Sequence, residues 1–275
     1  MTINTLLRKV NQNKRFNINT YDFFKPTFNV KLAESRGEIK LAQKLRYKVF
    51  FSERIKNPIL NIGNFRRDSD KFDNYADHII VTHRKSKFSK TKVIGTYRLL
   101  KQSVAEKKSG FYSCDEFNLE NLLNSRIYNN MLELSRSCIS QKFRNKNVLQ
   151  LMWKEIHHYI NKNNIDALFG TASFLNTNIS KIEDQLIYLN HHHKMPDNIT
   201  VSALPKYRVN IDYQKKINLN VRLFAKLPTL IKAYLKFNAS IGTGAVIDNK
   251  FKTTDVFIFL PIEKINKEYV NKILD

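Results

Sequence analysis

The sequence predicts a mixed α/β domain, of the α/β or α+β class, and three observations support this prediction. Segments with strand-like alternation and segments with helical spacing take turns along the chain. Residues 78–83 and 93–100 are rich in β-branched side chains and are joined by a basic turn, which predicts an antiparallel pair within a mixed central sheet. Hydrophobic residues make up 42% of the 275 residues, so the chain can fill a large core.

The other elements are predicted in order from periodicity and turn residues. Residues 1–27 are expected to form a basic N-terminal arm, and residues 28–275 a single domain in which 196–275 is a C-terminal extension. The polar stretch 57–77 is expected to be a long loop. The remaining predictions are a strand at 28–32, a helix at 38–51, a short helix at 118–125, a strand at 131–139, a helix at 148–161, a strand at 167–174, a helix at 179–189, a strand at 255–260 and a helix at 263–274.

The C-terminal extension contains a basic amphipathic segment, 221–237. Its apolar residues fall on one face, and its basic residues lie largely off that face. Such a helix suits contact with a membrane surface or ordinary packing against the protein, and the pattern leaves both open. Pro228 is expected to start a helix, and Gly242 and Gly244 are expected to turn the chain.

The chain is strongly basic, with 47 lysine and arginine residues against 24 acidic ones and a formal net charge of +23. This charge favours nucleic acid, an anionic membrane face or an acidic protein as a partner. No base-stacking or base-reading motif accompanies the basic residues, so we expect no nucleic acid partner. The two cysteines suit a reducing cytoplasmic setting. We expect no secretory signal and no spanning helix, because no run approaches about 20 apolar residues.

An ionisable pair lies inside the apolar strand predicted at 131–139. Glu133 and Arg136 are three residues apart, and strand periodicity places such positions on opposite faces. The two side chains share a site only if a bulge or a splay of the strand re-aims one of them. A basic loop, 141–147, and a long helix follow, an order suited to holding an anionic group at a helix N-terminus.

Several stretches together resemble the N-acyltransferase family that makes lyso-ornithine lipid from ornithine and an acyl carrier protein thioester. They are residues 45–50 with 70–73, 93–100, 111–117 and 132–138, with the tail at 244–248 and 253–255. The first half also resembles the acyl-homoserine-lactone synthases, at Arg46, Phe50, Asp70, Asp73, Arg98, Glu133 and Arg136. A tryptophan of those synthases has no counterpart, because the only tryptophan here is Trp153. Both resemblances imply the GNAT acyltransferase fold, with a splayed central strand and flanking helices.

The resemblance implies roles for individual residues. Glu133 is expected to be the general base that takes a proton from the attacking amine, with Arg136 beside it. A structural ion pair of Glu133 with Arg98 or Arg136 is the alternative. Asp70 and Asp73 are expected to pair with ammonium groups of the amino acid, although a solvated acidic loop gives the same pattern. Arg46 and Arg136 are expected to orient the carboxylate of the same substrate or to bracket the site.

The acyl donor is expected to be an acyl carrier protein, used as a co-substrate, with no metal or other cofactor. The loop 141–147 lacks the glycines that let backbone N–H groups approach the pyrophosphate of coenzyme A. The residues expected to hold the donor are Arg98, Ser137, Cys138, Ile139, Lys142, Arg144 and Lys146. Cys138 is expected to be a buried strand cysteine, with an acyl-accepting thiol as the alternative. The acyl pocket is expected to include Phe50, Phe111 and Trp153. Phe111, Tyr112 and Phe117 are expected to line an acyl tunnel, with core packing as the equal alternative.

The predicted function is transfer of a 3-hydroxyacyl chain to the α-amine of ornithine. The alternatives are acylation of another amino acid such as glycine or glutamine, synthesis of an acyl-homoserine lactone, and a non-enzymatic module that binds nucleic acid. Because the product is an amphiphile, we expect a cytoplasmic enzyme with peripheral contact to the anionic inner face of the membrane, with 221–237 as the candidate contact.

Overall fold

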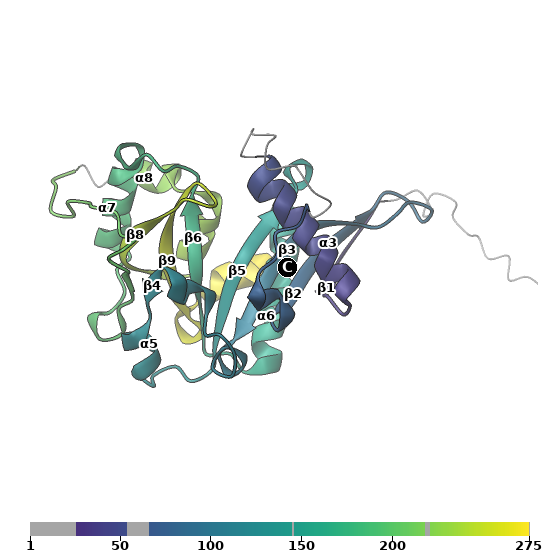
Figure 1. The fold of residues 1–275 in the computed structure, drawn as a ribbon, viewed down its shortest axis with the longest axis horizontal. Helices are drawn as coiled ribbons and strands as arrows, with labels where there is room; N and C mark the ends of the chain where they lie inside the picture. The colour runs from purple at the N-terminus through teal and green to yellow at the C-terminus, as the bar shows by residue number, and fades with distance from the viewer. Residues whose placement is uncertain (1–25, 54–65, 145, 218–220, 275) are drawn as a thin grey trace, which may run out of the picture.

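The computed structural model describes residues 26–53, 66–144, 146–217 and 221–274. The basic arm predicted at 1–27 lies outside the described residues up to residue 25. The same holds for the loop predicted at 57–77 up to residue 65. The strands of the described residues belong to one sheet. Figure 1 shows this sheet with helices on both of its faces.

Within the described residues, nine strands form one mixed sheet in the order β1-β2-β3-β5-β6-β9-β8-β7-β4. The β5–β6 and β7–β8 pairs are parallel, and the other neighbours are antiparallel. This sheet confirms the predicted fold class. The strands are β1 (Thr27–Leu32), β2 (Asp77–Arg84), β3 (Lys92–Lys101), β4 (Phe117–Asn118), β5 (Met131–Ile139), β6 (Ala167–Phe174), β7 (Ser202–Ala203), β8 (Ser240–Asp248) and β9 (Thr253–Pro261).

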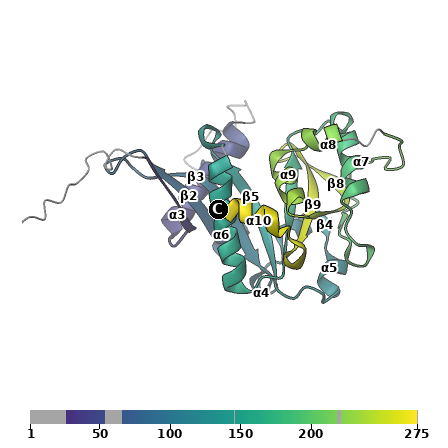
Figure 2. The ribbon, with the colours of Figure 1, turned by 180° about the vertical axis from the view of Figure 1, so that it is seen from behind.

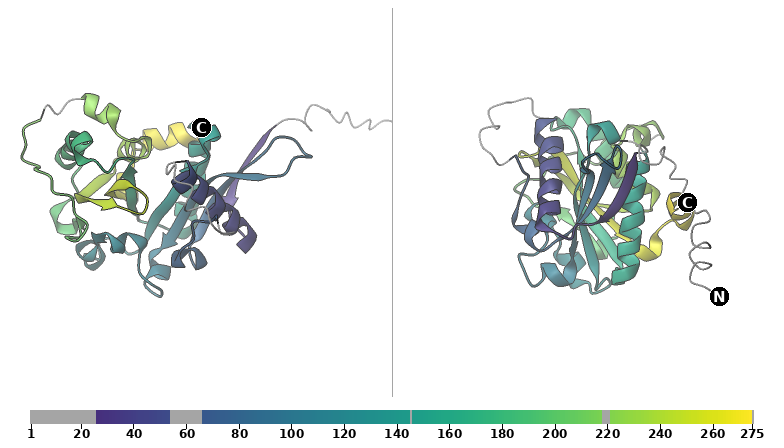
Figure 3. Two further views of the ribbon diagram at one scale, coloured as in Figure 1. Left: turned by 45° about the horizontal axis from the view of Figure 1, so that its top comes forward. Right: turned by 90° about the vertical axis from the view of Figure 1, so that its right-hand side faces the viewer.

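Two long helices cover opposite faces of the half of the sheet that contains β1, β2, β3 and β5. Figure 3 shows α3 (Arg36–Tyr47) on one side and α6 (Lys146–Asn163) on the other. The side chain of Ser35 accepts a hydrogen bond from the Glu38 N–H at 3.2 Å, which caps the start of α3. Val148, Met152 and Ile156 recur every four residues on α6 and have no exposed surface. This spacing presents one apolar stripe of α6 to the sheet.

Shorter helices surround the other half of the sheet. Figure 2 shows α9 and α10 on the same side as α6. The remaining described α-helices are α4 (Gln102–Ala105), α5 (Glu120–Asn124), α7 (Glu183–His192), α8 (Val221–Lys226), α9 (Thr229–Lys236) and α10 (Lys267–Leu274). Single helical turns lie at Lys48–Ser52, Lys71–Asn74, Tyr112–Asp115, Gln141–Phe143, Ile179–Lys181, Asp197–Ile199 and Ile262–Lys264.

The prediction that Gly242 and Gly244 turn the chain is wrong, because both lie inside strand β8. A Cβ atom on Gly242 would meet the Val201 carbonyl oxygen at 2.7 Å, so the glycine admits a neighbouring backbone. Gly244 has a φ of 84° at the point where the register with β9 shifts. The glycines therefore mark a bulge within a strand, a pattern that resembles a turn in sequence.

The amphipathic segment 221–237 forms two helices, α8 and α9, separated at Pro228. Pro228 is the N-cap of α9, as expected for a proline at a helix start. The apolar face of the segment is buried in the core, with Leu227 3% and Ile231 0% exposed. This face packs against the protein and is therefore not available to a membrane. Peripheral membrane contact through other surfaces of the protein stays a prediction. Among the described residues, no helix is both long enough and apolar enough to cross a membrane.

Candidate active site

Strands β5 and β6 pair at one end and separate at the other. Their parallel register covers Met131, Leu132 and Glu133 of β5, opposite residues 167–169 of β6. Beyond these positions the ladder ends, and Figure 1 shows the two strands diverging. A Cβ atom on Gly170 would meet the Leu134 carbonyl oxygen at 2.1 Å, so a glycine is needed where the strands part. A splayed central strand was the sequence prediction, and it is confirmed.

Strand β5 contains a bulge just after the residues that pair with β6. The register between β3 and β5 shifts between Thr96 and Arg98, where two steps along β3 oppose the three steps from Ser135 to Cys138. Arg136 lies inside this interval with a left-handed φ of 54°, a conformation rare for arginine. The bulge re-aims the Arg136 side chain, which is the condition under which Glu133 and Arg136 can share a site.

Arg46 of α3 is fully buried between two carboxylates. Its Nε donates to Asp68 at 2.9 Å, and its two terminal nitrogens donate to Asp73 at 2.8 and 2.7 Å. The side chain of Arg46 is 0% exposed, against 2% for Asp68 and 3% for Asp73. Despite burial, which opposes ionisation, the hydrogen bonds and charge of Arg46 hold the pKa of Asp73 below its usual range.

Asp70 is held by two further arginines. Nη1 of Arg98 lies 2.5 Å from Oδ1 of Asp70, and Nη2 of Arg136 lies 3.1 Å from Oδ2. The Nε of Arg136 also lies 3.1 Å from Asp68. We call these six residues, Arg46, Arg98, Arg136, Asp68, Asp70 and Asp73, the arginine network. The predicted substrate residues are therefore brought together, but arginines already neutralise their carboxylates. Contact of this network with an amino acid stays a prediction.

Glu133 lies at the closed end of the splay and has no exposed surface. Its Oε1 accepts hydrogen bonds from the Ser113 N–H and hydroxyl, both at 2.7 Å, and its Oε2 accepts one from the Tyr112 N–H at 2.9 Å. Burial raises the pKa of this carboxyl, although the bonds from Ser113 and Tyr112 oppose the rise. Glu133 thus fixes the turn Tyr112–Asp115, and no ion pair of Glu133 occurs among the described residues. Its role as the base stays a prediction.

The guanidinium of Arg136 lies between two aromatic rings. Its central carbon is 4.5 Å from the centroid of the Tyr112 ring and 4.7 Å from that of Phe251. Phe251 lies in the turn between β8 and β9. In the strand order of the sheet, these two strands follow β6, so they lie across the splay from β5. These cation–π contacts join the β5 bulge to the β8–β9 hairpin.

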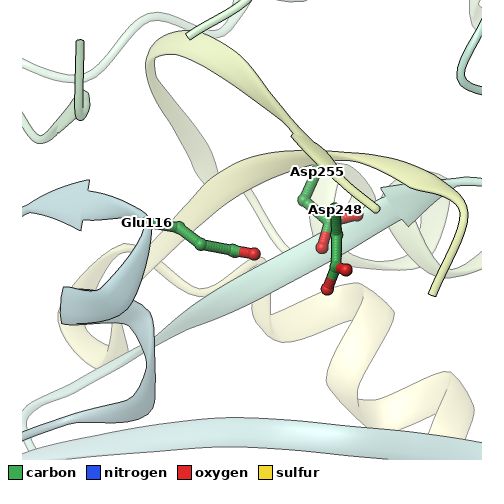
Figure 4. Close-up of side chains that lie close together, drawn as sticks. All are labelled: Glu116, Asp248 and Asp255. Carbon is green, nitrogen blue, oxygen red and sulfur yellow. The ribbon is translucent and has the colours of Figure 1, made fainter. Parts of the chain in front are cut away.

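A second acidic group lies near this hairpin and was not predicted from the sequence. One carboxylate oxygen from each of Glu116, Asp248 and Asp255 lies within 4.8 Å of the others. Figure 4 shows Glu116 reaching from the segment before β4 toward the two aspartates at the ends of β8 and β9. These positions belong to separate stretches of the family resemblance, and only folding brings them together. We call these three residues the open acidic cluster.

The residues predicted to hold the donor occupy several environments. Cys138 is 6% exposed, as expected for a buried strand cysteine. Arg144 is paired with Glu53 at 2.6 Å and donates to the Ile139 carbonyl oxygen at 3.1 Å. Ser137 is half-buried on β5, and Lys142 is exposed. The side chain of Lys146 lies outside what the structure describes.

The three aromatic residues predicted for an acyl pocket do not come together. Trp153, Phe111 and Phe50 belong to three separate hydrophobic clusters. Trp153 packs against Phe237 with ring centroids 4.5 Å apart, and Phe111 packs against Phe169 at 4.8 Å. Each ring therefore fills a different part of the core, and a role of any of them in an acyl pocket stays a prediction.

Comparison with known proteins identifies the family. A model of the acetyltransferase (GNAT) domain matches residues 45–154. The chain is 40% identical over 248 residues to an L-ornithine N(alpha)-acyltransferase of Brucella abortus (strain 2308), which covers 89% of this chain and 88% of that protein. The chain belongs to the L-ornithine N(alpha)-acyltransferase family. It is an acyltransferase, and the resemblance predicted from its motifs is confirmed.

Other members of the family show the same relationship. The protein of that name from Rhizobium meliloti (strain 1021) is 38% identical over 243 residues, covering 88% of this chain and 82% of that protein.

Among solved structures, the chain is similar to an N-acyl amino acid synthase from uncultured soil microbes. The match covers 87% of this chain and 94% of that protein, with 7% identity and a TM-score of 0.47.

Proposed function

We propose that the protein transfers an acyl chain from an acyl carrier protein thioester to the α-amine of ornithine, giving lyso-ornithine lipid. The 40% identity over 89% of the chain to a protein named for this acylation is the observation that supports the amino acid. In the reaction, the amine nitrogen attacks the thioester carbonyl carbon. A C–N bond forms, the C–S bond breaks, the amine loses a proton and the carrier's sulfur leaves as a thiol.

The splay between β5 and β6 is our candidate position for the thioester. The ladder between the strands ends after Glu133, so the edge of β5 at residues 134–139 no longer pairs with β6. Backbone N–H and C=O groups need partners, and an extended pantetheine arm has amides that can supply them. N–H groups at the bulge can also polarise the thioester carbonyl.

An acidic carrier protein suits the charge of this chain. The formal net charge of +23 favours steering of an acidic partner. Lys142 is exposed, and Arg144 is 47% exposed, in the segment that leads from β5 into α6. A carrier-bound pantetheine carries a single phosphate, which one or two such side chains can neutralise.

Glu133 is our candidate for the group that accepts the amine proton. A carboxylate offers about four acceptor positions, and the three hydrogen bonds from the turn leave one on Oε2. Glu133 is the last β5 residue in the ladder with β6, and this supports a location of its carboxylate next to the closed end of the splay. The elevated pKa of Glu133 brings the carboxyl closer to the range in which a general base works.

Lipid analysis of whole cells tests the function. Cells that lack ornithine lipid would express either this chain or its Glu133→Gln variant, and extracts would be compared by mass spectrometry. We expect an N-acylornithine with the unchanged chain and little or none with the variant. An acylated glycine or glutamine would refute ornithine as the substrate, and an acyl-homoserine lactone would refute the reaction itself.

A further inference from the structure

In the part of the chain that the structure describes, two groups of three carboxylates differ in what neutralises them. Asp68, Asp70 and Asp73 are paired with the three arginines of the arginine network. The open acidic cluster, Glu116, Asp248 and Asp255, makes no ion pair within 4.0 Å among the described residues. In a chain with a net charge of +23, an acidic cluster without a basic partner is unexpected.

Asp255 is a buried member of the cluster with an unsatisfied carboxylate oxygen. Its side chain is buried, with the residue 6% exposed, and its Oδ1 has no hydrogen-bond partner. Figure 4 shows this carboxylate directed toward Asp248 and Glu116. The Oε2 of Glu116 is also buried and has no partner. Unpaired buried carboxylate oxygens are costly, so they indicate a group that a bound ligand supplies.

The pKa values of the cluster's carboxyl groups favour a positively charged ligand. Burial, together with the charges of Asp255 and Asp248, raises the pKa of Glu116 to about 8. Burial also raises the pKa of Asp255 to about 6, although the side-chain hydroxyl groups of Ser173 and Thr253 oppose the rise, and the charge of Asp248 adds to it. Arg136 opposes both shifts from a greater distance. A cation placed among the three carboxylates would reverse the cause of these shifts.

We infer that the open acidic cluster binds the side-chain δ-ammonium of ornithine and thereby selects a dibasic amino acid. This inference rests on the proposed function, in which ornithine is the acyl acceptor. An ammonium group has three N–H donors, which match three converging carboxylates. Ornithine has two ammonium groups, and holding the δ-ammonium in the cluster leaves the α-amine as the one that reacts.

The position of the cluster supports this assignment. Arg136, whose bulge lies on the splayed strand, influences both Glu116 and Asp255 electrostatically. Phe251 contacts Arg136 and lies between Asp248 and Asp255 in the chain, and its N–H donates to Asp248 at 2.9 Å. The cluster therefore adjoins the splay where the thioester is proposed to lie.

The test compares ornithine with norvaline, which has the same carbon chain but no δ-ammonium. Purified protein would be assayed with acyl carrier protein thioester and each amino acid, and kcat/KM would be measured for both. The variants are Asp255→Asn, Asp248→Asn and Glu116→Gln, with Asp115→Asn as a control. Asp115 is exposed and adjacent to Glu116, so it has the same charge without the burial.

We expect the unchanged protein and Asp115→Asn to prefer ornithine strongly. Each cluster variant should reduce the ornithine-to-norvaline ratio about 10- to 100-fold, mainly through a higher KM for ornithine. Because the amide variants relieve the repulsion among three neighbouring carboxyl groups and cannot ionise, they should also keep or raise the melting temperature of the free protein. A raised or unchanged melting temperature shows that the variants are folded.

Three results would overturn the inference. The cluster variants could keep the full preference for ornithine, or lose kcat equally for both amino acids. Activity could instead require a divalent cation, with loss in a chelator and recovery with Mg²⁺, in which case the three carboxylates bind a metal ion. A failure of the proposed function looks different, because the unchanged protein would then form no N-acylornithine at all.

Discussion

The guanidinium of Arg136 lies 4.5 Å from the centroid of the Tyr112 ring, and Tyr112 in turn donates its backbone N–H to Glu133. Glu133 and Arg136 are therefore connected through a turn that is more than 20 residues away in the chain. Since Arg136 also pairs with Asp70, the same connection reaches the arginine network. A substitution at Glu133 can therefore have two effects. It can remove the group that accepts the amine proton, and it can displace the β5 bulge through the turn Tyr112–Asp115.

Two variants separate the proton-accepting role of Glu133 from its hold on the turn. Glu133→Gln removes the base and is expected to lower kcat by about 10²- to 10⁴-fold. Ser113→Ala removes one hydrogen bond that lowers the pKa of Glu133. That pKa should rise, so the acid limb of the pH–rate profile should move to higher pH while kcat at high pH changes little. Undiminished kcat in a folded Glu133→Gln protein would exclude Glu133 as the base.

Gly170 is needed for the splay, and replacing it tests that requirement. In Gly170→Ala the new Cβ atom would meet the Leu134 carbonyl oxygen, a backbone atom, at 2.1 Å. We expect a loss of more than about 1 kcal/mol in the free energy of unfolding, together with reduced kcat/KM. Gly37→Ala is the control, since its nearest contact is an ordinary 3.6 Å to Ser35. Urea denaturation that finds both variants equally stable would contradict the account.

Arg46 anchors the arginine network, and its loss should be costly. Arg46→Met leaves Asp68 and Asp73 without their principal partner, and breaking such a buried pair costs about 3 to 5 kcal/mol. Lys194→Met is the control, because Lys194 pairs with Asp197 at 2.6 Å on the surface, where Asp197 is 84% exposed. An exposed pair contributes about 0 to 1 kcal/mol. Similar denaturation midpoints for the two variants would show that the network does not stabilise the fold.

The sequence predicted much of the fold because its main signals are local. The apolar run of β6 and the helical spacing of α6 depend on residues within one element, and both elements were found. The sequence also indicated the condition for a site shared by Glu133 and Arg136, because a pair three residues apart in a strand cannot share a site without a bulge or a splay. The family motifs then indicated the splay.

The parts that were missed depend on contacts between distant segments. Gly244 was taken for a turn because its role in β8 depends on the neighbouring β7 and β9 strands. The aromatic residues Phe111 and Trp153 are equally apolar in sequence, and only the fold assigns them to different clusters. The open acidic cluster joins residues 116, 248 and 255, and no spacing rule relates positions so far apart.

His78 should make stability depend on pH. It is 1% exposed, its ring nitrogens have no hydrogen-bond partner, and Nε2 lies 3.7 Å from Asp73. Burial, with Arg46 and Arg98 nearby, lowers its pKa to about 4 despite the charge of Asp73. The folded state therefore binds fewer protons than the unfolded state between pH 6.5 and 4, so stability falls as the pH falls through this window.

Denaturation at several pH values measures this effect. For a shift from 6.5 to about 4, the loss between pH 7 and pH 4 is about 3 kcal/mol at most. His78→Gln should remove this part of the pH dependence and leave the acid-induced loss from Asp70 and Asp73, whose lowered pKa values place it at lower pH. The prediction would be wrong if both proteins lost the same stability between pH 6.5 and 5.

The most direct measurement follows both products of the reaction in one tube. Purified protein would be incubated with an acyl carrier protein thioester and ornithine, and N-acylornithine and free carrier thiol would be quantified together. We predict equal amounts of the two, formed with a higher kcat/KM than with the corresponding coenzyme A thioester. Release of thiol without N-acylornithine, or acylation that occurs only with coenzyme A, would contradict a carrier-dependent ornithine acyltransferase.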